Sequence, residues 1–191
     1  MRIGPRGARA AFTLIELMIV VVIIGILSVL AAYGVRKYIA NAKTAEARNA
    51  LGRIGGSAII AYERESMAGA ILMQQTSTPI TRALCLSASQ SVPASKASIA
   101  GAKYQSSPNE WSVDPVASGF ACLHFTMDAP QYYMYNYTAV GSTNPGDSFT
   151  AMANGDLNGD GVLSTFTLSG KINASYAVNV APNIAETSPE E

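Results

Sequence analysis

The feature that most constrains this chain of 191 residues is an apolar run at residues 12–32, which holds a single charge, Glu16. At about 1.5 Å per residue, a helix of this length crosses the hydrocarbon core of a membrane. A lone carboxylate near the bilayer centre costs about 2.5–3.5 kcal/mol on insertion scales, so a plain anchor gives no reason to keep it. Arg2, Arg6 and Arg9 precede the run with no acid among them, which favours a cytoplasmic N-terminus and a C-terminal body outside.

Three interpretations of this segment are open. A secretory signal peptide would be cut after Ala31 and Ala32, but its apolar region usually has about 7–15 residues, fewer than here. An ordinary single-pass anchor has the right length. Neither of these two interpretations accounts for Glu16, and a third one does.

The third interpretation starts from the letters FTLIELMIVVVIIGIL, which begin at Phe12. They resemble the prepilin signature of type IV pilins and pseudopilins. The resemblance implies a basic leader over residues 1–11, cleavage between Ala11 and Phe12, and N-methylation of Phe12. Residues 12–32 would then be the transmembrane and polymerisation helix. The family usually has Gly before the cut, where this sequence has Ala11.

The resemblance also implies an assembly role for Glu16, together with Phe12. The carboxylate would neutralise the free amine of Phe12 on a neighbouring subunit, and such an ion pair offsets the cost of placing an acid in an apolar bundle. Without cleavage that amine never forms, and Glu16 is expected to have no partner. The alternative is that Glu16 extends to the membrane interface, since it lies near the start of the run.

The helix is expected to continue past the apolar run to about Met67. No Pro follows before that point, and Ala-rich stretches favour helix. An apolar stripe recurs at three- and four-residue spacing, at Leu51, Ile54, Ala58 and Tyr62. A bend or a close packing contact is expected at the three glycines Gly52, Gly55 and Gly56.

The C-terminal part of the sequence predicts strands. Four segments have β-prone or alternating composition, at residues 120–127, 132–140, 148–154 and 163–170, and residues 175–180 are a candidate edge strand. The expected fold is therefore α+β, a pilin-like ladle in which one long N-terminal helix packs on an antiparallel sheet of about four strands. Residues 33–191, including the amphipathic half of the helix, would form the periplasmic or extracellular domain.

Two cysteines, Cys85 and Cys122, both lie in the part expected outside the cytoplasm. An oxidising compartment permits a disulfide between them, which would tie the loop region to the first expected strand. By loop-closure entropy such a bridge is worth about 3–4 kcal/mol. The alternative is a pair of buried free thiols.

A second motif, GDLNGDGVLSTF, has the opening of a calcium loop, D-x-[DN]-x-[DN]-G. Its candidate ligands are Asp156, Asn158, Asp160, the carbonyl of Val162, and Ser164. The position that normally supplies a bidentate Glu holds Thr167, which weakens the site. The alternative is a tight hairpin turn, because Asn-Gly and Asp-Gly are strong turn formers. No cofactor is required by this interpretation, and calcium is the only metal that the motif suggests.

The sequence shows no catalytic constellation, so the protein is predicted not to be an enzyme. His124 is its only histidine and is expected in mid-strand, without zinc-ligand spacing or a phosphate-binding loop nearby. Removal of the leader leaves ten basic residues against thirteen acids, which opposes nonspecific nucleic-acid binding. The expected helix has five basic residues, Arg36, Lys37, Lys43, Arg48 and Arg53. They either form ion pairs with Glu46 and Glu63 or gather into a local basic patch that could bind nucleic acid.

The resemblance implies the structural subunit of a type IV pilus filament, serving adhesion, surface motility or DNA uptake. The subunit would sit in the bacterial inner membrane as a single pass with a cytoplasmic N-terminus, and then in the pilus at the cell surface. Implied partners are the prepilin peptidase and methyltransferase, the inner-membrane assembly machinery, membrane lipid, and other copies of this chain. A pseudopilin of a type II secretion system is the alternative, because it shares this N-terminus.

Overall fold

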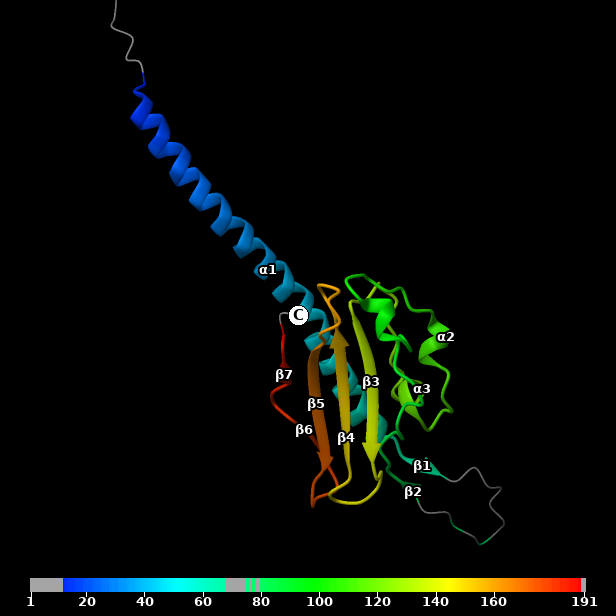
Figure 1. The fold of residues 1–191 in the computed structure, drawn as a ribbon. Coiled ribbons are helices and arrows are strands. Elements are labelled where there is room, and N and C mark those ends of the chain that lie inside the picture. The colour runs from blue at the N-terminus through cyan, green and yellow to red at the C-terminus, as the bar shows by residue number, and fades with distance from the viewer. Residues whose placement is uncertain (1–11, 68–74, 76, 78–79, 190–191) are drawn as a thin grey trace, which may run out of the picture. The chain divides into compact units, whose positions relative to one another are not determined.

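The computed structural model describes residues 12–67, 75, 77 and 80–189. The chain divides into two units, Met1–Ile39 and Ala40–Glu191, and each is described by itself (Figure 1). Helix α1 (Leu14–Glu63) contributes its first part to one unit and its second part to the other. The prediction of one long N-terminal helix is confirmed. The helix ends at Glu63, a few residues before the expected Met67, and Ser66–Met67 instead form β1, which pairs with β2 (Ile80–Thr81).

In the first unit, α1 is exposed, and it carries no charge between Glu16 and Arg36. Its large apolar side chains range from 46% exposed at Val20 to 76% exposed at Leu14. By length and composition, α1 contains a stretch able to cross a membrane, near the N-terminus, and none of that stretch is buried. This part of the helix therefore makes no core of its own.

In the second unit, α1 has a buried stripe that packs against a sheet. The stripe repeats at three- and four-residue spacing and joins the core cluster, with Ala47, Ala50, Leu51, Ile54, Ala58, Ala61 and Tyr62. A Cβ at Gly55 would lie only 2.8 Å from Leu168 Cδ2 of the sheet, so glycine permits the close approach there. Close packing is thus confirmed at Gly55, whereas Gly52 and Gly56 are exposed with open space around them.

The sheet is an antiparallel meander of β3 (Tyr133–Val140), β4 (Ser148–Gly155) and β5 (Ser164–Ile172), with α1 behind it in Figure 1. Two short strands complete it on the far side of β5. β6 (Val178–Val180) pairs with the end of β5, and β7 (Ala185–Thr187) pairs with its beginning. These strands confirm the sheet expected over 132–170 and the edge strand near 175–180.

Alternate side chains of these strands face the core. Tyr133, Tyr135 and Tyr137 of β3 are fully buried, as are Phe149 of β4 and Phe166 of β5. This period of two is what a sheet with one buried face requires.

The strand predicted at residues 120–127 is wrong. Residues Gly119–Leu123 form a short helix, α3, and His124 closes it in the left-handed conformation with φ of 49°. Phe120, Leu123 and Phe125 are all buried, although the expected alternation put Phe120 on the opposite face from the other two. Phe120 and Leu123 are three residues apart and so lie on the same face of a helix, whereas a strand would place them on opposite faces. His124 accordingly caps a helix and is exposed.

An aromatic cluster holds the connection between helix and sheet. Trp111, at the end of α2 (Pro108–Trp111), lies edge-on to Phe120 and Phe125, with ring centroids 4.9 and 5.3 Å away. Its indole Nε1 donates to Ser106 Oγ at 2.9 Å, and that hydroxyl donates to Gln131 Oε1 at 3.1 Å. The side-chain polar groups of Trp111 and Ser106 therefore have hydrogen-bond partners although they are buried. A short 3₁₀ helix, η1 (Lys96–Ile99), buries Ile99 in the same connection.

Cys85 and Cys122 form the predicted disulfide, with Cα atoms 5.8 Å apart. Cys85 lies in a segment beside β3, where Leu84 N donates to Ser142 O and Ala88 N donates to Tyr137 O. Because Cys122 belongs to α3, the bridge joins this segment to a helix and not to a strand.

Candidate functional site

Glu16 and Thr13 form a reciprocal cap at the start of α1. Glu16 Oε2 accepts hydrogen bonds from the Thr13 backbone N–H and from its hydroxyl, each at 2.8 Å. The Glu16 backbone N–H donates to Thr13 Oγ1 at 3.2 Å. This is a capping box, which satisfies donors that the first helical turn leaves open. Thr13 thus gives Glu16 hydrogen bonds within its own chain, and the ion pair of Glu16 with the amine of Phe12 stays a prediction.

Only one oxygen of the Glu16 carboxylate takes part in the described cap. Both Thr13 donors bind Oε2, and among the described residues no hydrogen bond or ion pair involves Oε1. A carboxylate offers about four lone-pair sites, so the cap leaves room for a further donor. Phe12, four residues away, is 83% exposed. Ala11, on the other side of the predicted cut, lies outside the described residues.

The surface that follows the cap is apolar for about five helical turns. No charge occurs between Glu16 and Arg36. Each square ångström of apolar surface left in water costs about 25 cal/mol, so this surface favours apolar surroundings.

Residues 6–32 match the family model of the prokaryotic N-terminal methylation motif. The chain carries a prepilin-type N-terminus. The match supports the type IV pilin and prepilin-type family, as the letters FTLIEL predicted, and points to a structural protein. No curated protein and no solved structure matches the chain.

Outside the prepilin-type segment, the calcium-like motif forms a tight loop between β4 and β5. Both carboxylate oxygens of Asp156 accept backbone amides, from Gly159 at 2.6 Å and from Gly161 at 3.1 Å. Asn158 Oδ1 accepts from the amide of Asp160, and Asp160 Oδ1 accepts from that of Val162. Gly159 and Gly161 have φ of 80° and 90°, which side chains rarely adopt.

The structure brings some of the calcium candidates together but not all. Ser164 is fully buried in β5 and its hydroxyl donates to the carbonyl of Gly155 at 3.1 Å. Thr167 lies three residues further along the same strand, about 10 Å away at the rise of a strand. Within the described residues, no three His, Cys, Asp or Glu side chains form a group able to hold a metal. Calcium at Asp156, Asn158 and Asp160 stays a prediction.

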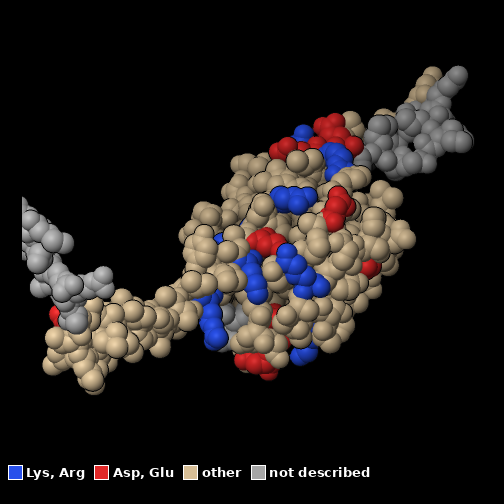
Figure 2. Space-filling model, turned by 90° about the horizontal axis from the view of Figure 1, so that it is seen from above, with Lys and Arg blue, Asp and Glu red and all other residues tan. Residues whose placement is uncertain are grey.

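The basic residues of α1 in the second unit contact aromatic rings and acids. Lys43 and Lys103 both lie over the ring of Tyr132, with Nζ 4.7 and 4.6 Å from its centroid, and Arg53 lies 4.9 Å from that of Phe125. On the face of the molecule that Figure 2 presents, blue and red side chains are interspersed, which is not the uniform basic surface that a polyanion requires.

Two acids, Glu186 and Glu46, accept hydrogen bonds that tie α1 to the sheet. The sequence analysis did not predict these contacts. Arg48 donates to both oxygens of Glu186 in β7, at 2.7 and 2.9 Å. Glu46 Oε1 accepts from the backbone N–H of Tyr132 at 2.8 Å and from the hydroxyl of Tyr135 at 3.4 Å. Burial raises the pKa of Glu46, and the hydrogen bond from Tyr132 acts against that rise.

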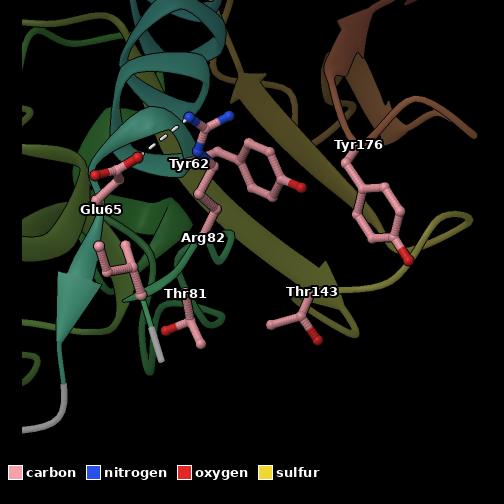
Figure 3. A pocket seen from close by; sticks show the side chains of 7 residues that line it. Tyr62, Glu65, Thr81, Arg82, Thr143 and Tyr176 are labelled. Carbon is pink, nitrogen blue, oxygen red and sulfur yellow. Dashed lines mark hydrogen bonds and ion pairs between the residues drawn. The ribbon is translucent and has the colours of Figure 1, made fainter. Parts of the chain in front are cut away.

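Sequence reasoning missed a pocket of about 500 Å³ in the second unit. Four separate segments form it, and it holds two tyrosines and an ion pair (Figure 3). No local motif marks such a site, because its residues come together only through the fold.

Proposed function

We propose that this chain is a structural subunit of a type IV pilus filament, cut by prepilin peptidase between Ala11 and Phe12 and N-methylated on Phe12. The subunit then polymerises through residues 12–32. The methylation motif over residues 6–32 carries the proposal, because that motif is read by the enzymes that cut and methylate prepilins.

The exposed apolar half of α1 supports assembly through this helix. Phe12 to Ile39 presents large apolar side chains on every side, so the segment suits a bundle of like helices better than one face of a soluble core. Before assembly the same surface suits lipid, with the subunit as a single pass through the inner membrane and its N-terminus in the cytoplasm. Export into the filament exchanges lipid contacts for helix contacts.

The cap geometry supports an intersubunit role for Glu16. Oε2 keeps its two Thr13 donors, while Oε1 is available to the amine of Phe12 on a neighbouring subunit. The intrasubunit cap and the intersubunit ion pair are therefore compatible. In an apolar bundle, loss of one partner from a buried ion pair costs about 3–5 kcal/mol.

Substitution of Glu16 tests this proposal. Glu16→Gln keeps an oxygen for Thr13 but removes the negative charge, so we expect processed subunits to accumulate in the membrane while surface filaments are lost. Glu63→Gln is the matched control, since Glu63 is exposed at the other end of α1, and it should leave filament yield unchanged. Filaments are sheared from cells and quantified by immunoblot against membrane fractions. Wild-type filament yield from Glu16→Gln cells contradicts the pairing.

A pseudopilin of a type II secretion system is a second candidate. The observation that favours it is the loop at Asp156, Asn158 and Asp160, whose sequence resembles the calcium loops of some pseudopilins. The two candidates predict different phenotypes on deletion of the gene. Loss of surface filaments, with adhesion, motility or DNA uptake, supports the pilus, and loss of exported enzymes from the medium supports the pseudopilus.

A further inference from the structure

We propose that the pocket at the C-terminal end of α1 binds a neutral saccharide. It has a volume of about 500 Å³, within the range of about 300–1,000 Å³ typical of ligand pockets. Its lining comes from the end of α1, from β2 and the residue after it, and from the turns after β3 and β5, with Tyr62, Glu65, Ile80, Thr81, Arg82, Thr143 and Tyr176. All of these residues belong to the second unit.

The buried tyrosine Tyr62 points an unpartnered hydroxyl into this pocket. Its side chain is 2% exposed, and among the described residues no hydrogen bond to its hydroxyl is formed. Figure 3 shows the hydroxyl directed across the pocket toward Tyr176. The hydroxyl is not among the described side-chain atoms that are buried without a partner, so it is open to water from the pocket. A ligand hydroxyl would replace that water and form a hydrogen bond with Tyr62.

The second tyrosine, Tyr176, forms the opposite wall and is 57% exposed. It lies in the turn between β5 and β6 with φ of 56°, a conformation that non-glycine residues seldom adopt. Its neighbours hold the turn, because the side chain of Asn173 accepts from the amides of Ser175 and Ala177 at 2.8 and 2.9 Å. The turn thus presents a large aromatic ring beside the pocket. The negative face of such a ring attracts the C–H face of a sugar ring.

The remaining polar groups suit neighbouring hydroxyls rather than a charged ligand. A guanidinium nitrogen of Arg82 lies 3.4 Å from Glu65 Oε1. The pocket therefore has the N–H donors of Arg82 beside the carboxylate oxygens of Glu65, and the two charges cancel. Both side chains are about half exposed, so their ion pair is weak and can exchange with ligand hydroxyls. Thr81 and Thr143 add hydroxyls that both donate and accept. Each hydroxyl of a sugar also donates and accepts, which fits this mixture better than a phosphate or carboxylate would.

The inference goes beyond filament assembly and does not rest on it. The test uses the full-length chain in a zwitterionic detergent, since a detergent with a sugar headgroup would compete for the pocket. Labelled protein is applied to an array of neutral and anionic saccharides. The Kd of the strongest neutral saccharide is then measured by calorimetry for the wild type and for three variants.

Two variants change the pocket with little change in the fold. Tyr62→Phe removes only the hydroxyl, and we expect the Kd to rise about three- to tenfold, the effect of one hydrogen bond. Tyr176→Asn removes the aromatic wall with a residue that tolerates positive φ, and we expect about a tenfold or larger rise. Tyr104→Phe is the matched control, because its hydroxyl donates to Glu110 outside the pocket and its loss should leave the Kd unchanged. Circular dichroism checks that each variant is folded.

Three outcomes would overturn the proposal. One is that no neutral saccharide binds the wild type above the level of Tyr176→Asn. Another is that binding occurs with the same Kd in both pocket variants. The third is that only anionic saccharides bind, which would mean that the class of ligand is wrong.

Discussion

The two parts of helix α1 have the same secondary structure and opposite surroundings. From Phe12 to Ile39 the large apolar side chains are about half exposed or more, whereas in the second unit Leu51, Ile54 and Ala58 are fully buried. The first part is apolar on all sides, and the second is apolar along one stripe. Apolar content alone therefore does not decide burial within a chain. The pattern around the helix decides whether the partner is the chain's own sheet or something outside it.

The difference assigns separate roles to two stretches of one helix. The second stretch contributes to the stability of the globular unit, and under the proposed function the first stretch serves insertion and assembly. Substitutions of the same kind in the two stretches should therefore have different consequences, which the following predictions use.

The largest expected effect comes from a matched pair, Ile54→Ala and Ile24→Ala. Ile54 is fully buried between α1 and the sheet, so its truncation should lower the free energy of unfolding by about 2–5 kcal/mol. Ile24 is 56% exposed, and its truncation should leave the unfolding of the globular unit unchanged. Urea denaturation of the detergent-solubilised chain, followed by the fluorescence of Trp111, measures both. Equal destabilisation by the two substitutions would contradict the separation.

A smaller effect concerns Glu46, which ties α1 to the sheet and has a raised pKa because it is half-buried. A raised folded-state pKa means that the folded state binds the proton more tightly than the unfolded state. Stability from this group is therefore present at low pH and is lost as the pH rises above the ordinary value of 4.5. Glu46→Gln keeps an oxygen for the Tyr132 N–H, so we expect higher stability at pH 7 and a flatter dependence between pH 4 and 7.

Glu63→Gln, with an exposed side chain on the same helix, provides the control for Glu46. It should leave the pH dependence of the urea midpoint as in the wild type. A Glu46→Gln variant that is less stable than the wild type at pH 7 would show that the charged carboxylate stabilises the helix on the sheet.

The smallest effect is expected from calcium at the loop of Asp156, Asn158 and Asp160. The loop amides are already bound by these side chains, so we expect the protein to stay folded in EDTA. A site at Asp156, Asn158 and Asp160 predicts a stabilisation of about 1.4 kcal/mol at a calcium concentration ten times the Kd. Asp160→Asn should reduce that gain. No rise in Tm with millimolar calcium contradicts the calcium prediction and leaves a hairpin turn.

Patterns within a few residues predicted much of the fold. The stripe at Leu51, Ile54 and Ala58 predicted the packed face of α1, and β-prone composition predicted β3 and β5. The strand at 120–127 failed because its apolar residues satisfy more than one period. Tertiary contacts with Trp111, and not the local alternation, selected the short helix.

The sites follow the same division. The letters FTLIEL are contiguous, so the prepilin-type segment could be found from the sequence. The pocket could not, because Tyr62, Arg82 and Tyr176 come from distant segments and ordinary positions. The clearest sign of the pocket is the positive φ of Tyr176, which the sequence does not reveal.

The central proposal is that residues 12–39 pack against other copies of this chain only after cleavage, within a filament. Mass spectrometry of filaments sheared from the cell surface tests it most directly, because one spectrum reports the subunit, its N-terminus and its methylation. The account predicts abundant chain that begins at N-methylated Phe12. Filaments without this chain, or a mature chain that begins after Ala32 and lacks the apolar segment, would contradict it.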